Sequence, residues 1–209
     1  SEREKTLAAD GADAVIDRMI GLCTRILTAL GARAGDVHAL CVGVPGGVDD
    51  ERGLVDTAPN LGWSQVPLGE RLSAALGMRV FLDNDVRGAV VGEHAYGVGK
   101  GTRTMVGIFV GTGIGGGLIV GHHTHHGGRG VAGEIGHMTL VPHGPRCHCG
   151  KRGCVEALAS RTAMDRDVRR LIKKGWDSKI PKLMKKAETE VLTSSVIERA
   201  LDSDDEVMR

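Results

Sequence analysis

Residues 105–120, MVGIFVGTGIGGGLIV, decide the fold of this chain. The run 105–110 is apolar, the segment 111–117 is rich in glycine, and residues 118–120 are apolar again. Short apolar runs bounded by glycine are typical of buried strands. The stretch therefore predicts two strands, at 105–110 and 118–120, separated by a glycine-rich segment.

Strand and helix patterns alternate on the N-terminal side of this stretch. Apolar residues at helical spacing predict helices at 15–30, 68–76 and 85–96, and short apolar runs predict strands at 39–44 and 79–82. Strands that alternate with helices indicate an α/β chain whose sheet is covered by helices. The sequence therefore places this chain in the α/β class.

The remaining segments are predicted to be loops and C-terminal helices. The polar, turn-rich stretch 48–63 predicts a loop, and the glycine and histidine residues of 121–130 predict the tip of a hairpin. Residues 155–174 and 187–201 are charged and amphipathic, which predicts two helices. The C-terminal part is therefore expected to be helical.

Composition and charge exclude several classes of function. The 209 residues include 27 Lys and Arg against 26 Asp and Glu, a formal charge of +1. This balance provides no excess of basic residues to bind nucleic acid. Aromatic residues make up only 2%, too few for a platform that stacks bases. No apolar run approaches the roughly 20 residues that a membrane span needs. We therefore expect a cytoplasmic protein that binds neither nucleic acid nor membrane, and whose ligand is small.

Three clustered cysteines give the sharpest chemical signal in the sequence. Cys147, Cys149 and Cys154 follow His137, and thiolates with one imidazole form the tetrahedral set that structural Zn²⁺ prefers. Free or buried cysteines are the weaker alternative. A nucleic-acid-binding zinc finger is disfavoured because it usually has two ligand pairs and because the chain is neutral. We expect a zinc ion that stabilises an irregular loop.

Asn84 and Asp85 stand where a predicted strand ends and a predicted helix begins. Ligands bind at such strand ends in open α/β sheets, which favours a catalytic or binding role. Asp is also a common N-cap of helices, and the two roles are compatible. Position alone does not decide between capping and catalysis.

Two carboxylates accompany the predicted metal ligands. Glu134 precedes His137 by three residues, and Glu156 follows Cys154 by two. A sugar ligand presents several hydroxyl groups that need hydrogen-bond partners, and ionised carboxylates accept strongly from hydroxyl groups. For either residue taken singly, a solvated surface acid is the simpler interpretation.

The glycine-rich segment also has two interpretations. Gly111, Thr112 and Gly113 could wrap phosphate groups with backbone N–H groups, but the segment lacks the lysine of a P-loop and could equally be a hairpin turn. The histidines of the 121–130 loop could bind a second metal ion, although solvated side chains are favoured; they are His122, His123, His125 and His126.

Six motifs follow one another along the chain: Pro45-Gly46, Pro59-Asn60-Leu61-Gly62-Trp63, Leu82-Asp83-Asn84-Asp85, Gly111-Thr112-Gly113, Gly133-Glu134-Ile135-Gly136-His137 and Cys147-x-Cys149-Gly150-x-x-Gly153-Cys154-x-Glu156. In order and spacing they resemble the ROK family of sugar kinases and repressors. The last two motifs together are highly specific for that family. Among its members, the Asn-Leu-Gly-Trp segment is most similar to the zinc-containing bacterial glucokinases.

The resemblance implies an actin-like, ribonuclease-H-like fold of two lobes with the sugar between them. It implies residues 1–82 as the remainder of the small lobe and 83–209 as the large lobe with the zinc loop. It further implies phosphorylation of a hexose, most simply glucose, by ATP accompanied by Mg²⁺, in a homodimer or higher homo-oligomer.

The resemblance also implies a role for each site residue. Asp85 would be the base that takes the proton from the sugar 6-hydroxyl, and Gly111, Thr112 and Gly113 would contact ATP. The other sugar contacts would be Gly46, Asn84, Glu134, His137 and Glu156, with His137 also binding zinc beside Cys147, Cys149 and Cys154.

The chain departs from the family pattern at both ends. Family members open with a phosphate loop of the Asp-x-Gly-x-Thr type and close with a glycine-rich adenosine segment, and neither is found in this sequence. We therefore expect an internal fragment. A sugar-responsive regulator of the same family and a sugar-binding fragment without turnover are the alternatives.

Overall fold

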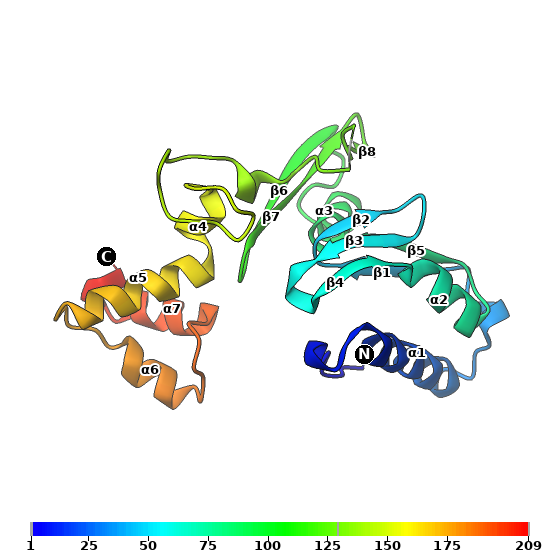
Figure 1. Cartoon of the computed structure of the whole chain (residues 1–209), viewed down its shortest axis with the longest axis horizontal. Helices are drawn as coiled ribbons and strands as arrows, with labels where there is room; N and C mark the ends of the chain where they lie inside the picture. Colours follow the sequence, from blue (N-terminus) through cyan, green and yellow to red (C-terminus); the bar gives the residue numbers. More distant parts are fainter. Residues whose placement is uncertain (1, 129, 209) are drawn as a thin grey trace. The chain divides into compact units, whose positions relative to one another are not determined.

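A computed structural model describes residues 2–128 and 130–208. The chain forms two compact units, one of Ser1–Val106 with Gly117–Gly133 and one of Gly107–Gly116 with Glu134–Arg209 (Figure 1). The lobe boundary expected after Leu82 stays a prediction.

A parallel pair of strands forms the centre of the first unit. Strand β1, Leu40–Val44, pairs with β5, Val80–Asn84, in a register that runs from Leu40 opposite Val80 to Val44 opposite Asn84. Both strands were predicted from their apolar runs. Because parallel strands end at the same edge of a sheet, the residues after Val44 and after Asn84 are brought together.

The predicted loop at 48–63 is wrong, because this region forms a three-stranded antiparallel sheet. Its strands are β2 Gly47–Asp49, β3 Leu54–Ala58 and β4 Trp63–Val66. Each strand has only three to five residues, and the turns between them are rich in polar residues and glycine. Strands this short leave too few residues for a recognisable alternating pattern. Burial of Val55 and Trp63 holds the sheet on the core.

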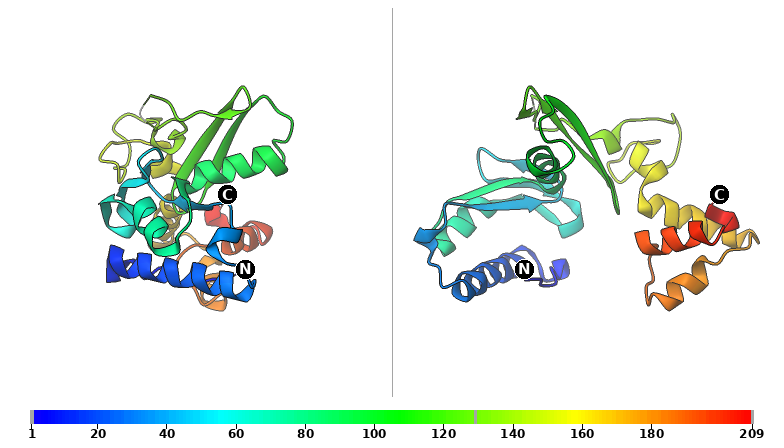
Figure 2. Two further views of the ribbon diagram at one scale, coloured as in Figure 1. Left: turned by 90° about the vertical axis from the view of Figure 1, so that its right-hand side faces the viewer. Right: turned by 180° about the vertical axis from the view of Figure 1, so that it is seen from behind.

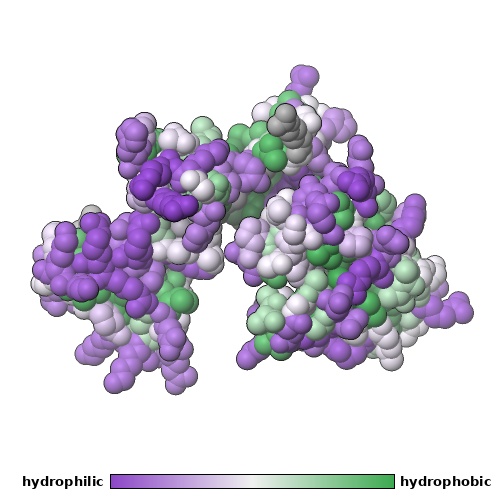
Figure 3. Space-filling model, viewed as in Figure 1, coloured by the Kyte–Doolittle hydropathy of each residue, from purple (hydrophilic) through white to green (hydrophobic). Residues whose placement is uncertain are grey.

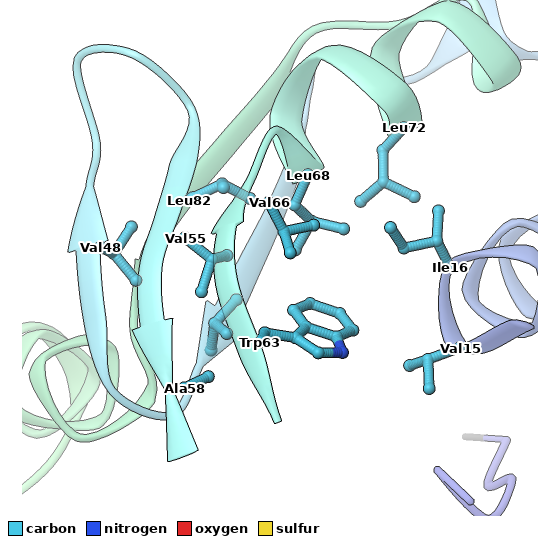
Figure 4. Packing of buried hydrophobic residues seen from close by; sticks show 11 residues of the cluster. Val15, Ile16, Val48, Val55, Ala58, Trp63, Val66, Leu68, Leu72 and Leu82 are labelled. Atoms are coloured by element: carbon cyan, nitrogen blue, oxygen red, sulfur yellow. The ribbon is translucent and has the colours of Figure 1, made fainter. Parts of the chain in front are cut away.

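Helices pack on the first unit from both sides of the β1–β5 pair. Helix α1, Ala12–Ala29, and helix α2, Leu68–Leu76, lie on one face, and α3, Asp85–Tyr96, lies on the other (Figure 2). Figure 4 shows Val15 and Ile16 of α1 directed toward Trp63 and Leu72. Ile16 and Leu72 are fully buried, so burial of their side chains contributes to the stability of the contact between α1 and α2.

The stretch that decided the fold class forms a hairpin that belongs in part to each unit. Strand β6, Thr104–Val110, is followed by β7, Ile114–Val120, and then by the short β8, His123–Thr124. The glycine-rich loop was expected to extend to Gly117, but β7 begins at Ile114. Glycine is favoured at position 117, because a Cβ atom there would lie 2.9 Å from Val90 and would be too close to it.

The predicted hairpin tip is confirmed at the start of its range. Val120 pairs with His123, so Gly121 and His122 form the turn. Arg129, within the same predicted loop, lies outside the described residues.

Four helices build most of the second unit. They are α4 Val155–Ala159, α5 Arg161–Lys173, α6 Ile180–Lys186 and α7 Ser194–Asp202. Hydrophilic side chains predominate on the face of α5, α6 and α7 seen in Figure 3. Their apolar sides meet in a core that includes Val168, Ile180, Leu192 and Val196. Short one-turn helices complete the chain at Ala8–Asp10, Ala34–Asp36, Pro59–Leu61, Ile135–His137 and Glu206–Met208.

The C-terminal helices differ from their predicted extents. The helix expected at 155–174 is interrupted at Ser160, whose backbone is extended and whose Oγ accepts a hydrogen bond from Ala163 N–H at 3.1 Å. The helix expected at 187–201 begins only at Ser194, after the N-cap residue Thr193. Each hydroxyl accepts a hydrogen bond from a backbone N–H in the first turn of the helix that follows, Ala163 at Ser160 and Val196 at Thr193, and so caps the start of that helix.

In the described part of the chain, no helix combines the length and the apolar character needed to cross a membrane.

Candidate functional site

The end of β5 carries the first group of predicted site residues. Asn84 is the N-cap of α3, since its Oδ1 accepts hydrogen bonds from the N–H groups of Val86 at 3.0 Å and Arg87 at 3.1 Å. Asp85 is the first residue of the helix and is exposed, and its Oδ1 accepts from Val86 N–H at 2.9 Å. Asn84 therefore fills the capping role that position alone had left open for Asp85.

Gly46 lies against this group. Its φ is +100°, and a Cβ atom here would overlap the carbonyl oxygen of Thr57, so only glycine fits. The Gly46 carbonyl accepts a hydrogen bond from Asn84 Nδ2 at 3.0 Å. The parallel pairing of β1 with β5 thus brings together Gly46, Asn84 and Asp85.

Arg87 supports the same group and was not predicted. Its side chain is only 5% exposed; it forms an ion pair with Asp83, and its Nη1 donates to the Gly130 carbonyl at 3.0 Å. The Asp83 carboxylate also accepts from Asn84 N–H at 2.7 Å. The four-residue spacing of Asp83 and Arg87 was a signal for the pair, but not for its burial.

The second unit gathers the predicted metal ligands. One ligand atom from each of His137, Cys147, Cys149 and Cys154 lies within 4.8 Å of all the others. The Cys149 and Cys154 sulfurs are 3.7 Å apart, and Cys147 Sγ is 3.6 Å from His137 Nδ1. A zinc–sulfur bond of about 2.3 Å gives a tetrahedral edge of about 3.8 Å, so this set fits zinc.

The loop around the cluster depends on tight backbone packing. Cys147 N–H donates to the Lys151 carbonyl at 2.8 Å, and Gly150 N–H donates to the Cys147 carbonyl at 3.0 Å. At Gly153, φ is +71° and a Cβ atom would overlap the Val141 carbonyl oxygen. Glycine at this position allows the loop to fold back and present its sulfurs to one point.

The pKa values of the three thiols show which protons a metal ion must displace. Burial raises the pKa of Cys147 to about 12 and also raises the pKa of Cys154. Burial acts in the same direction on Cys149, but hydrogen bonds from the Lys151 backbone and from the other two thiols lower its pKa overall. A divalent cation would replace these protons, because thiolates are the metal-binding form.

The predicted sugar-binding residues of the second unit adjoin this cluster. His137 directs Nδ1 toward Cys147 and Nε2 toward Glu134, whose Oε2 is 3.9 Å away. Glu156 Oε1 is 3.7 Å from Cys147 Sγ, and its Oε2 accepts from Ile114 N–H at 2.9 Å. The structure therefore brings Glu134, His137 and Glu156 to one place, with one imidazole nitrogen on the metal side.

The glycine-rich segment is a tight turn next to Glu156. Gly111 N–H donates to the Gly113 carbonyl at 2.8 Å, which closes the connection between β6 and β7. A Cβ atom at Gly113 would overlap the Glu156 carboxylate. The hairpin interpretation is confirmed for this segment, and its phosphate-binding role stays a prediction.

Two further residues of the second unit contact this turn and were not predicted. Arg161 Nη2 donates to Thr112 Oγ1 at 3.0 Å, and Thr162 Oγ1 donates to the Thr112 carbonyl at 2.8 Å. They lie 49 and 50 residues from Thr112 along the chain. No local sequence pattern signals a contact over such a separation.

The histidines near the β7–β8 hairpin do not form a second metal centre. Among residues 2–128 and 130–208, the four-ligand cluster at His137 is the one group found to be suitable for a metal ion. The Nδ1 atom of His126 instead lies 3.5 Å from Asp50 Oδ2. The interpretation as ordinary surface histidines is therefore favoured.

Comparison with known proteins places this arrangement in a family. The ROK family model matches residues 6–206. The chain belongs to the ROK family. This confirms the resemblance inferred from the motifs, and the ROK sugar kinase fold confirms the predicted α/β class.

ROK proteins similar to this chain include kinases and repressors. The chain is 43% identical to the glucokinase of Thermotoga maritima over 143 residues, 68% of this chain and 45% of that protein. It is 37% identical to the putative xylose repressor of a Caldicellulosiruptor species over 134 residues, 64% of this chain and 34% of that protein. The aligned part thus spans less than half of these relatives.

A solved structure extends the likeness over nearly the whole chain. The ROK family glucokinase from Streptomyces griseus, in complex with glucose and AMPPNP, is 31% identical and superimposes with a TM-score of 0.75. The match covers 94% of this chain and 62% of that one. The fold described above is therefore that of a large part of a ROK protein.

Proposed function

We propose that this protein transfers the γ-phosphoryl group of ATP to the 6-hydroxyl of a hexose, with glucose as the substrate. The observation that carries the proposal is the exposed carboxylate of Asp85 at the end of β5. Asn84 caps the helix, so Asp85 is left available for a substrate. The similarity to glucokinases supports the same conclusion.

The proposed reaction needs a base because a sugar hydroxyl is a poor nucleophile. The Asp85 carboxylate accepts the proton as the sugar oxygen attacks the γ-phosphorus, and ADP leaves with the electron pair of the broken bond. Gly46 and Asn84 stand beside Asp85 and contribute to holding the sugar. Their mutual hydrogen bond fixes the shape of this part of the site.

In the second unit, we propose that Glu134, His137 and Glu156 bind the other sugar hydroxyls. A carboxylate accepts hydrogen bonds from hydroxyl groups, and the His137 imidazole presents Nε2 while Nδ1 faces the cysteines. Zinc bound by His137, Cys147, Cys149 and Cys154 would fix the orientation of that ring. The metal's contribution is structural, since four protein ligands leave no open position.

For the nucleotide, we propose that Gly111, Thr112 and Gly113 contact the phosphate groups of ATP. Backbone N–H groups in a glycine turn can approach phosphate oxygens closely. Mg²⁺ bound to ATP would supply positive charge to offset the negative charge that develops on the transferred group.

A coupled assay that measures ADP formation tests the proposal. With glucose, we expect ADP and hexose 6-phosphate in equal amounts; 6-deoxyglucose, which lacks the acceptor hydroxyl, should inhibit without being phosphorylated. ADP formation with mannose, fructose and N-acetylmannosamine in parallel reactions shows which hexose is the preferred substrate. Equal ADP formation with 6-deoxyglucose, or none with any sugar, would contradict the proposal.

A sugar-responsive regulator is the second candidate, because xylose repressors also match the chain. A regulator would bind a sugar through Glu134, His137 and Glu156 without consuming ATP. A chain that binds sugar but supports no turnover would match either this candidate or a sugar-binding fragment. Specific binding of operator DNA by the complete protein would separate the two.

A further inference from the structure

The proposed phosphate turn lacks a positive charge of its own. Residues 111–117 contain neither Lys nor Arg, whereas glycine-rich phosphate sites commonly combine backbone N–H groups with a cationic side chain. If the turn receives the phosphates of ATP, a cationic side chain that contacts them must come from another segment of the chain.

Arg161, the first residue of α5, brings a guanidinium group to this turn. Its Nη2 donates to Thr112 Oγ1 at 3.0 Å, and its backbone N–H donates to the Gly111 carbonyl at 2.9 Å. The side chain is half-buried, so its position is constrained by the neighbouring protein. Main chain and side chain of one residue thus both contact the turn.

The charge of Arg161 is not neutralised by a carboxylate, in contrast to the other arginines of α5. Arg166 pairs with Asp167 at 2.8 Å, Arg169 with Asp165 at 2.7 Å, and Arg170 with Asp167 at 3.3 Å. No carboxylate of the described residues lies within ion-pair distance of the Arg161 guanidinium. Its charge is therefore available to an anionic ligand.

Thr162 holds the turn in reach of Arg161. Its Oγ1 donates to the Thr112 carbonyl at 2.8 Å, while Arg161 donates to the Thr112 hydroxyl. Two adjacent residues of α5 therefore hydrogen-bond to Thr112. Loss of either contact would let Thr112 move relative to the guanidinium. Thr162 acts through Thr112 and is a positioning residue.

We propose that Arg161 supplies the cationic side chain of the nucleotide site and binds the phosphate groups of ATP beside Mg²⁺, with Thr162 positioning the turn. This inference rests on the proposed function, because it requires the turn at Gly111–Gly113 to be the phosphate site. Guanidinium suits phosphate better than ammonium does, since its planar fork donates two parallel hydrogen bonds.

Calorimetric titration of the full chain with Mg-AMPPNP and with adenosine tests the inference. Arg161→Met should weaken Mg-AMPPNP binding about tenfold, the effect of losing a hydrogen bond between charged groups. Adenosine affinity should not change, because adenosine has no phosphate. Arg161→Lys should bind Mg-AMPPNP with intermediate affinity, and added salt should weaken the wild type more than Arg161→Met.

Arg170→Met is the matched control, since Arg170 lies on the same helix but pairs with Asp167 rather than with the turn. The affinities of Arg170→Met for Mg-AMPPNP and for adenosine should equal those of the wild type. Thr162→Val should weaken Mg-AMPPNP binding while Thr162→Ser, which keeps the hydroxyl, should restore it.

The outcomes separate this inference from the proposed function. Wild-type binding of Mg-AMPPNP that Arg161→Met leaves unchanged would overturn the inference alone, as would an equal loss of adenosine affinity. A wild-type chain that binds adenosine no less tightly than Mg-AMPPNP would contradict the proposed phosphate site, and the inference with it.

Discussion

The Glu156 carboxylate accepts a hydrogen bond from the backbone N–H of Ile114 at 2.9 Å, across 42 residues of the sequence. Its other oxygen faces Cys147 Sγ at 3.7 Å. One side chain therefore joins the metal-binding loop to the first residue of β7, directly after the glycine turn. Glu156 has a structural role as well as its proposed role in sugar binding.

Substitution of Glu156 should separate these two roles. Glu156→Gln keeps an oxygen that accepts from Ile114 N–H, so stability should be preserved while sugar affinity falls with the lost charge. Glu156→Ala leaves that N–H without its partner and should lower the free energy of unfolding by about 1 kcal/mol or more. Chemical denaturation and sugar titration of both variants measure the two effects. Equal stability of the two variants would contradict the structural role.

Metal binding should release protons and tighten as the pH rises. The pKa values of Cys147 and Cys154 are raised by burial, so these thiols carry protons at neutral pH that a metal ion must displace. Titration with zinc against a competing chelator, at several pH values in weak buffer, measures affinity and proton release together. Cys147→Ser should lose the metal, and Cys23→Ser, in α1, should retain it. Affinity that is independent of pH would argue against thiolate ligands.

Two glycines of the metal-binding loop form a matched pair. Gly150 and Gly153 both have positive φ, +89° and +71°, but only at Gly153 would a Cβ atom overlap the backbone of another segment. Gly153→Ala should therefore reduce the bound zinc strongly, whereas Gly150→Ala should cost only the strain of its backbone conformation, about 1 kcal/mol. Elemental analysis of the purified variants decides the point. Similar zinc contents would show that packing against Val141 does not limit the loop.

The buried contact of α1 with α2 should contribute strongly to the stability of the first unit. Ile16 is fully buried against α2 and the sheet, so Ile16→Ala should cost about 2–5 kcal/mol in the free energy of unfolding. Leu30, at the end of the same helix, is 73% exposed, and Leu30→Ala should change stability by less than about 0.5 kcal/mol. Equal effects of the two substitutions in chemical denaturation would contradict this packing.

The sequence predicted best those parts of the fold whose signals are local. Helices α2 and α3 begin and end at the predicted residues, because apolar spacing and a following glycine mark them. The metal cluster was predicted from cysteine spacing for the same reason. The strands β2, β3 and β4 were missed because their stability comes from pairing and burial against α1 and α2 rather than from their own pattern.

Long-range contacts explain what the sequence could not show about the site. The ion pair of Arg87 with Asp83 has a local spacing, but its burial depends on the distant Gly130 carbonyl. The contacts of Arg161 and Thr162 with Thr112 arise only when α5 packs on the hairpin turn. Such partners are brought together by the tertiary fold and have no signature at either position.

We propose that Asp85 is the base in a phosphoryl transfer from ATP to a hexose. Phosphorus NMR of a reaction containing glucose and Mg-ATP, with wild type and Asp85→Asn compared at equal sugar occupancy, tests it most directly. The wild type should form hexose 6-phosphate and ADP, and Asp85→Asn should bind glucose but form the ester about 10²–10⁴-fold more slowly. A near-normal rate for Asp85→Asn, or no ester from the wild type, would contradict the claim.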